Sequence, residues 1–125
     1  MREVEEYEEE HARLVASLVL SEDNRHQRIG ARVHDVGSPH FARDVELICA
    51  AAAKLAYIVV PKVDGVAQTR RAIELINQHA AKAGRKDLPV HVLIETHGAL
   101  RDVFRIAANP RIESLSFGLM DFVSA

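Results

Sequence analysis

Apolar residues along the chain alternate between helical spacing and short β-branched runs. The first stretch predicts an amphipathic helix from about Val4 to Val19, within an acidic helical segment over residues 1–20 whose glutamates point outward. The expected packing stripe of this helix consists of Val4, Tyr7, His11, Leu14 and Leu18. A polar loop follows over residues 21–27.

A strand and a second helix are expected next. Residues 28–34 form a short, partly alternating strand, and Ser38 can cap a helix that has Pro39 in its first turn. The stripe of this helix consists of Phe41, Val45, Ile48, Ala52 and Leu55. The chain then enters the β-branched run 57–63, which is typical of a parallel strand buried on both faces.

The same alternation continues to the end of the chain. A third helix begins near Val66 and ends near Gly84, which is suited to the left-handed conformation after a helix. A strand over 90–94, a fourth helix that stops at 109–110, and a strand over 114–119 complete the pattern. The apolar positions of the fourth helix are Leu100, Val103, Phe104 and Ala107.

This order, α(βα)₃β, predicts parallel βα repeats. Strand starts lie roughly 25–33 residues apart, which suits βαβ crossovers in a sheet that is either open or part of a (βα)₈ barrel. A complete barrel needs on the order of 200 to 250 residues. We therefore expect residues 1–125 to form a single partial TIM-barrel domain, as a fragment of a longer protein, with a complete small α/β sandwich as the alternative.

Composition narrows the class of protein. The apolar share of 48% is enough to bury a core. Cys49 cannot form an internal disulfide and lies in an apolar helical context, which favours a core residue and a reducing, cytoplasmic location. No apolar run reaches the length of a membrane span, and the acidic amino terminus is unlike a secretory signal, so we expect a soluble protein.

The net charge of −2 is unevenly distributed. Residues 1–10 carry six glutamates and one arginine, which leaves 15 Lys and Arg against 12 Asp and Glu in the rest of the chain. The mildly cationic body suits an anionic substrate, but its basic residues are scattered and the chain has no Trp. These features argue against nucleic-acid binding.

Glu95 ends the apolar strand over 90–94. Alternation places Glu95 on one face with His91 and Leu93, opposite an apolar face that should contact helices. It also lies at the carboxyl end of its strand, where catalytic groups of βα proteins collect. For an isolated glutamate, the alternative is a helix N-terminal acid that pairs with backbone amides, with Thr96 as the helix cap.

Asp121 favours a functional role for Glu95 over that alternative, because it ends the next apolar run in the same way. Gly118 precedes it and leaves room beside the backbone for a ligand or a bulge, so strand parity alone does not settle where Asp121 points. Two neighbouring carboxylates repel each other unless a cation lies between them. Glu95 and Asp121 therefore predict a Mg²⁺ site.

Arg32 is the candidate anion-binding residue. An arginine inside an apolar strand needs an anionic partner, and its guanidinium can bind a carboxylate through two hydrogen bonds. The alternative is an internal ion pair with Asp35 or with Glu95.

Other polar residues surround this proposed site. Lys62 ends the second strand and could form a Schiff base in principle, although a structural or anion-steering ammonium is favoured. His34 and His97 are candidate polar contacts to substrate, whereas His91 is expected to be a hydrogen-bonded interior residue. The chain has no phosphate-binding glycine loop, nucleophile elbow or cysteine pair.

At these residues the chain resembles the citrate lyase beta-subunit family, within the larger group that includes malyl-CoA lyases and HpcH/HpaI aldolases. The similarity covers most of the chain in the family's order. It is carried by Gly-Ala-Arg-Val-His (30–34), Val-Val-Pro-Lys-Val (59–63), Leu-Ile-Glu-Thr (93–96) and Ser-Phe-Gly-Leu-Met-Asp-Phe (116–122). Two positions depart from it: His34 replaces a common asparagine, and His97 lies where small residues are frequent.

The resemblance implies a TIM barrel, of which this chain matches the third to sixth strands. It places Glu95 and Asp121 on the family's Mg²⁺ ligands and Arg32 on the arginine that holds the substrate carboxylate. The implied chemistry is reversible cleavage of a β-hydroxyacyl thioester, on coenzyme A or an acyl carrier protein, into an acetyl-type thioester and a 2-oxo acid. A homo-oligomer is expected.

Two hypotheses therefore remain open. The first is a Mg²⁺-dependent carbon–carbon lyase acting on a citryl, malyl or citramalyl thioester, with this chain as its central portion. The second is a truncated half-barrel that does no chemistry and serves as an assembly or interaction module.

Overall fold

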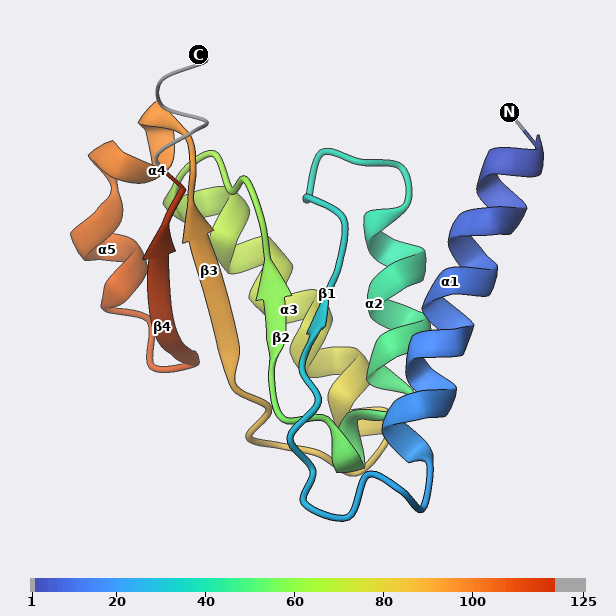
Figure 1. Ribbon diagram of the computed structural model, residues 1–125. Coiled ribbons are helices and arrows are strands. Elements are labelled where there is room, and N and C mark those ends of the chain that lie inside the picture. The colour runs from blue at the N-terminus through green and yellow to red at the C-terminus, as the bar shows by residue number, and fades with distance from the viewer. Residues whose placement is uncertain (1, 119–125) are drawn as a thin grey trace.

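The computed structural model describes the backbone of residues 2–118 and the side chains of residues 7–118, and these residues form one four-stranded parallel sheet (Figure 1). Each strand lies beside the next one along the chain, in the order β1-β2-β3-β4. The strands are β1 (Ala31–Arg32), β2 (Ile58–Val60), β3 (Val90–Ile94) and β4 (Ile112–Phe117). The helices are α1 (Arg2–Leu20), α2 (Phe41–Cys49), the 3₁₀ turn η1 (Ala52–Lys54), α3 (Val66–Lys82), α4 (His97–Arg101) and α5 (Val103–Ala107).

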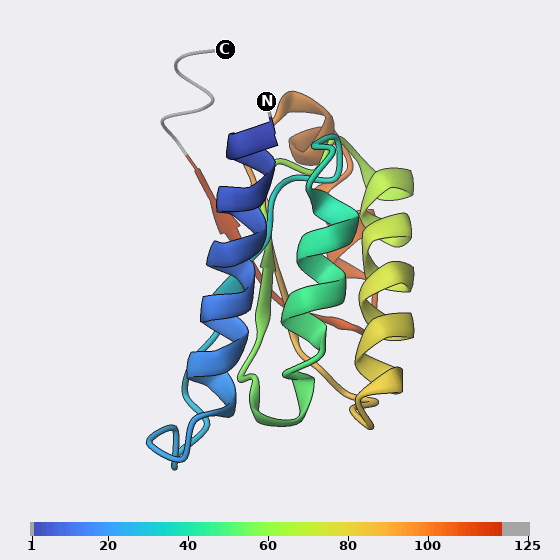
Figure 2. The same ribbon diagram turned by 90° about the vertical axis from the view of Figure 1, so that its right-hand side faces the viewer.

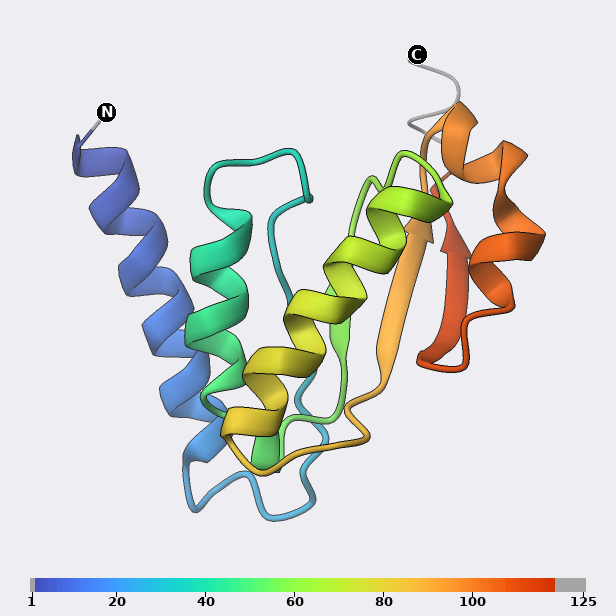
Figure 3. The same ribbon diagram turned by 180° about the vertical axis from the view of Figure 1, so that it is seen from behind.

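The helices form a single layer. Helix α1 contacts α2, α2 contacts α3, and α3 contacts α5, so they pack in chain order. Figure 3, seen from behind, shows α3 crossing in front of the strands, and Figure 2 shows α1, α2 and α3 side by side. Within residues 2–118 the opposite face of the sheet carries no second layer. This is the arrangement predicted for consecutive units of a (βα)₈ barrel.

Strand β3 shows why the sheet is covered on one face. Val90, Val92 and Ile94 are fully buried against the helices, whereas His91 and Leu93 are half-buried on the other face. The predicted bounds and alternation of this strand are confirmed. The prediction that the second strand is buried on both faces is wrong for the described residues, because only one face of the sheet has a helical layer.

The predicted packing stripe of α1 is also wrong. Tyr7, Leu14 and Leu18 are each more than half exposed, and the buried residues of this helix are Ala12 and Val19. These two lie roughly a third of a turn around the helix from the expected stripe. Helix α1 packs against α2, and the side that it buries is the one with Ala12 and Val19 rather than the predicted stripe.

Two elements near β1 differ from their predicted bounds. Strand β1 covers only Ala31 and Arg32 of the expected strand 28–34, but backbone hydrogen bonds continue the pairing with the second strand on both sides, from the Ala56 amide to the Ile29 carbonyl (2.9 Å) and from the Val33 amide to the Val59 carbonyl (3.1 Å). Helix α2 begins at Phe41 without a side-chain cap, because the Ser38 hydroxyl accepts a hydrogen bond from the His40 amide (3.1 Å) ahead of the helix. The helix also stops at Cys49 and continues as the turn η1. The five predicted stripe residues are all buried: Phe41, Val45, Ile48, Ala52 and Leu55.

The predicted fourth helix is two short helices. The break occurs at Asp102, whose side chain contacts the start of α3 instead of the local backbone. The buried residues are Ala99 and Ile106, while Phe104 is 88% exposed. Helix α3, in contrast, ends as predicted, with Gly84 in the left-handed region at φ +84°.

Cys49 is a core residue, as predicted. Its side chain is fully buried, and burial raises the pKa of its thiol to about 12. The thiol is therefore protonated at neutral pH and a poor nucleophile. Among the described helices, none combines the length and the apolar character needed to cross a bilayer.

Substitutions on opposite faces of β3 test the one-sided packing. Ile94→Ala and Leu93→Ala remove the same number of carbon atoms. Because Ile94 is fully buried, we expect Ile94→Ala to lower the free energy of unfolding by about 2–5 kcal/mol. Leu93→Ala should cost roughly half of that or less, since Leu93 is half-buried. Urea unfolding followed by circular dichroism measures both values, and equal losses would contradict a core on one face.

Candidate active site

The carboxyl ends of three neighbouring strands bring together Arg32, Lys62 and Glu95. Arg32 ends β1, Lys62 follows β2, and Glu95 follows β3. The strands are parallel and consecutive in the sheet, so their carboxyl ends lie at one edge. At this edge the Glu95 carboxylate oxygen Oε2 accepts a hydrogen bond from the backbone amide of Lys62 (3.0 Å). The side chain that ends β3 is thus tied directly to the end of β2.

An unusual backbone conformation presents the Lys62 amide. Lys62 has φ +50°, in the left-handed region that non-glycine residues rarely adopt. The preceding Pro61 is buried, and the hydrogen bond to Glu95 compensates part of the conformational cost. We infer that Glu95 and the Lys62 backbone hold each other in place.

Gly118, at the end of β4, makes room for Glu95. Its amide donates to the Ile94 carbonyl (3.0 Å), which continues the sheet ladder by one residue. A Cβ atom at position 118 would lie 2.7 Å from Cγ and 3.0 Å from Oε1 of Glu95. The space that the sequence predicted beside Gly118 is therefore filled by the Glu95 side chain itself.

Thr96 caps α4, as the alternative interpretation of Glu95 expected. Its hydroxyl accepts a hydrogen bond from the Ala99 amide (3.0 Å) and donates one to the Val63 carbonyl (2.8 Å). Thr96 therefore both caps the helix and links it to the loop after β2. Because Thr96 satisfies the helix terminus, Glu95 is not needed there, and its carboxylate turns to Lys62 instead.

Asp102 binds the other end of the loop between β2 and α3. Its Oδ2 accepts a hydrogen bond from the Val66 amide at the start of α3 (3.0 Å), next to Gly65 at φ +140°. The Arg101 guanidinium, and then the Val66 amide, hold the pKa of Asp102 below its ordinary value of 3.8. Helices α3 and α4 are thus joined at the edge that carries Lys62 and Glu95.

Arg32 lines a cavity of about 540 Å³ beside this edge, together with Lys62 and His34. Among residues 7–118 the Arg32 guanidinium forms no ion pair, so the predicted alternative of internal pairing with Asp35 or Glu95 is not seen there. A cation that lines a cavity in this way is suited to an anionic ligand.

His34 is held by a residue that the sequence pattern did not single out. Asp44, on α2, accepts hydrogen bonds through Oδ2 from the His34 backbone amide (2.9 Å) and from its ring nitrogen Nδ1 (2.5 Å). The other ring nitrogen, Nε2, lies 3.3 Å from Glu8 Oε2 on α1. Asp44 lies on the buried face of α2. An acid among the apolar positions of a helix is the sequence signal that could have identified it.

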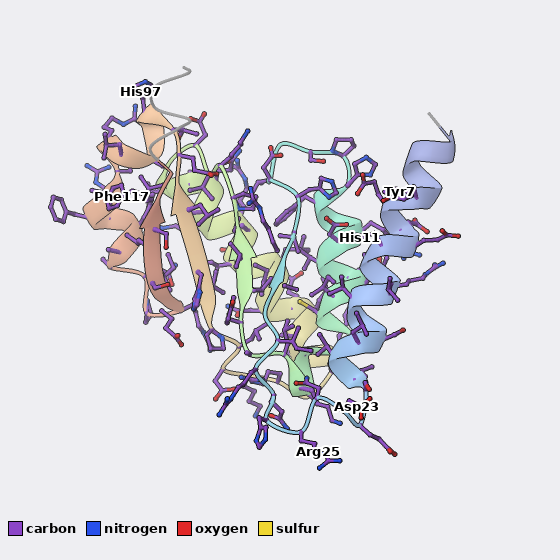
Figure 4. All side chains as sticks on the ribbon, in the orientation of Figure 1. Tyr7, His11, Asp23, Arg25, His97 and Phe117 are labelled. Carbon is purple, nitrogen blue, oxygen red and sulfur yellow. The ribbon has the colours of Figure 1, made fainter. Side chains whose placement is uncertain are left out.

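His97 and Asp121 are the remaining predicted site residues, and His91 lies nearby on β3. His97 is the first residue of α4 and is exposed at the carboxyl edge, at the opposite end of the molecule from Asp23 and Arg25 (Figure 4). Asp121 lies outside the described residues. His91 is hydrogen-bonded, as predicted, but is half-buried rather than interior: its ring stacks on Tyr57 (centroids 4.2 Å apart) and lies 3.2 Å from Glu113 Oε1.

The described part of the chain contains no group of three or more His, Cys, Asp or Glu residues that could hold a metal ion. Glu95 contributes one carboxylate. Its Oε2 accepts the hydrogen bond from the Lys62 amide. An anionic oxygen of this kind suits a hard cation such as Mg²⁺, provided that a further oxygen ligand completes the site.

The Asp102 contact predicts a pH dependence of stability. The pKa of Asp102 is lower in the folded protein than in the unfolded chain, so its stabilising effect is complete above roughly pH 4 and is lost as the pH falls through the lowered value. Asp102→Asn should therefore flatten the decline of the urea midpoint over roughly pH 4 to pH 2. Asp23→Asn, in the distant loop after α1, is the control and should keep the wild-type slope. An unchanged slope in Asp102→Asn would contradict this role.

Comparison with known proteins identifies relatives along most of the chain. The profile of the HpcH/HpaI aldolase/citrate lyase family matches residues 7–125. An L-malyl-CoA/β-methylmalyl-CoA lyase from Rhodobacter capsulatus is 30% identical over 100 residues, covering 78% of this chain and 31% of its own. The corresponding enzyme from Cereibacter sphaeroides is 31% identical over 100 residues, which again cover 78% of this chain and 31% of the relative.

A solved structure agrees with these sequence matches. The crystal structure of a citrate lyase from Burkholderia xenovorans LB400 has 47% sequence identity and a TM-score of 0.87, covering 94% of this chain and 37% of its own. The chain spans about a third of the length of these relatives, and the partial TIM-barrel fold is confirmed. The chain belongs to the HpcH/HpaI aldolase/citrate lyase family.

Proposed function

We propose that this chain supplies the central part of the active site of a carbon–carbon lyase. The reaction is cleavage of a β-hydroxyacyl thioester into an acetyl-type thioester and a 2-oxo acid. The observation that carries the proposal is the carboxyl edge of β1 to β3, where Glu95 is tied to Lys62 beside the cavity that Arg32 lines. The names of the malyl-CoA and citrate lyases that resemble the chain support the same reaction class.

Arg32 is the proposed site for the carboxylate of the 2-oxo acid. Its guanidinium can form two parallel hydrogen bonds to a carboxylate, which fixes both the position and the plane of that group. Fixing the carboxylate orients the neighbouring hydroxyl-bearing carbon, whose bond to the next carbon breaks. Orientation of this kind lowers the barrier because the reacting bond is already aligned.

The electron balance defines what the rest of the site must do. The substrate hydroxyl loses its proton and becomes the carbonyl of the 2-oxo acid, while the electron pair of the broken bond passes to the α-carbon of the thioester. That carbon then takes up a proton to give the acetyl-type thioester. Lys62, at the end of β2 and lining the cavity, adds positive charge close to the anionic substrate.

The proposal includes Mg²⁺ as cofactor. Glu95 and Asp121 are the residues that would hold it. When bound, Mg²⁺ withdraws charge from the oxygens of the 2-oxo acid. The thioester carrier is coenzyme A or an acyl carrier protein, His97 is an additional polar contact, and the enzyme is a cytoplasmic homo-oligomer. A non-catalytic half-barrel is the competing hypothesis, and the next two experiments separate it from the lyase.

The first test is release of 2-oxo acid from citryl, malyl and citramalyl thioesters. Because a charge-assisted hydrogen bond contributes about 1.5–3 kcal/mol, we expect Arg32→Lys to lower kcat/KM roughly tenfold to a hundredfold. Arg25→Lys, at the opposite end of the molecule, is the matched control and should retain wild-type kinetics. Absence of release with every thioester would favour the non-catalytic half-barrel.

The second test is a thermal melt with increasing Mg²⁺. A ligand that binds only the folded protein raises its melting temperature, so the wild-type chain should shift upward with Mg²⁺ concentration. The double substitution Glu95→Gln, Asp121→Asn should abolish the shift. Glu113→Gln, which removes an exposed carboxylate from β4, should leave it intact. If the shift survives the double substitution, the two acids are not the metal site.

A further inference from the structure

The His34–Asp44 pair is the feature that the proposed reaction leaves unexplained. His34 lines the cavity beside Arg32, and Asp44 lines it from α2. A single oxygen of Asp44 accepts both the backbone amide and the ring nitrogen Nδ1 of His34. The ring is therefore held at two points, which fixes its orientation as well as its position.

Burial of Asp44 shows how much this carboxylate depends on its hydrogen-bond donors. The Asp44 side chain is only 9% exposed, and an ionised carboxylate in such a place needs a strong donor. An ionised carboxylate is only an acceptor, so Nδ1 of His34 carries the proton in this hydrogen bond. The second ring nitrogen, Nε2, is left directed away from Asp44.

Glu8 shows what Nε2 binds. The Glu8 carboxylate on α1 lies 3.3 Å from Nε2, and its side chain is 26% exposed, as part of the cavity wall. Each ring nitrogen of His34 thus faces a carboxylate oxygen, which is a hydrogen-bond acceptor. Nε2 of His34 is therefore directed at a carboxylate in the wall of the cavity.

We propose that His34, positioned by Asp44, binds a second carboxylate of the substrate, and that Glu8 occupies this position when substrate is absent. The inference rests on the proposed function, in which Arg32 binds the first carboxylate. Arg32 and His34 are two residues apart and line one cavity of about 540 Å³, which is large enough for a four-carbon dicarboxylate. The favoured product is therefore a 2-oxo acid with two carboxylates. Asp44 is a positioning residue and Glu8 an internal competitor.

The test compares two acids that differ by one carboxylate. Oxaloacetate has the framework of pyruvate with a second carboxylate attached, so the ratio of their dissociation constants isolates the second site. Calorimetric titration of the full chain with freshly prepared acids gives both constants from one preparation. Both constants are measured on the same preparation, so a change in the fraction of correctly folded protein does not alter their ratio.

We expect the wild-type chain to bind oxaloacetate at least tenfold more tightly than pyruvate. His34→Asn should reduce the ratio to near one, and Asp44→Asn should reduce it severalfold, because an amide oxygen holds the His34 ring less firmly than a carboxylate does. Glu8→Gln should tighten oxaloacetate binding severalfold by removing the competitor. Glu10→Gln, an exposed acid of the same helix, is the matched control and should behave as wild type.

Two results would overturn the inference. Equal binding of the two acids by the wild-type chain, or a ratio that survives His34→Asn, would show that His34 does not bind a second carboxylate while leaving the proposed function in place. Binding of neither acid would overturn the proposed function and this inference together. The two failures are therefore distinguishable in one set of titrations.

Discussion

Burial of one face of β3 is the constraint on which the rest of the structure depends. Val90, Val92 and Ile94 are excluded from water by the helical layer, and side chains on a strand alternate between faces. The same burial therefore directs His91, Leu93 and Glu95 to the opposite face. Since β1, β2 and β4 are parallel to β3, their carboxyl ends share the edge at which Glu95 emerges. Hydrophobic packing on one side thus places the polar groups on the other.

The loops at this edge are held by hydrogen bonds that each join two segments. Glu95 binds the Lys62 amide, Thr96 binds both the start of α4 and the Val63 carbonyl, and Asp102 binds the start of α3. Each of these side chains satisfies a backbone group that helix and strand ends leave without a partner. The result is a connected edge in which displacement of one loop would strain the next. Such rigidity is what orientation of a reacting bond requires.

Charge is organised around the cavity beside this edge. Arg32 and Lys62 provide cations from the strand ends, while Glu8 and Asp44 provide acids from the helical side. His34 lies between the two acids and links α1, the segment after β1, and α2. The acidic amino-terminal segment, which from the sequence alone is a solvated helix, therefore has at least one glutamate directed at a candidate binding site.

By itself, the sequence determined the order of helices and strands, the bounds of β3, the Gly84 terminus, the Thr96 cap and the family, because these depend on local periodicity, backbone preference and short motifs. Only the tertiary structure decided which face of α1 is buried, where the fourth helix breaks, and that Asp44 holds His34. Those features depend on contacts between residues distant along the chain. A spacing of three or four residues shows that a helix has an apolar stripe, but the neighbouring helix determines which face it covers.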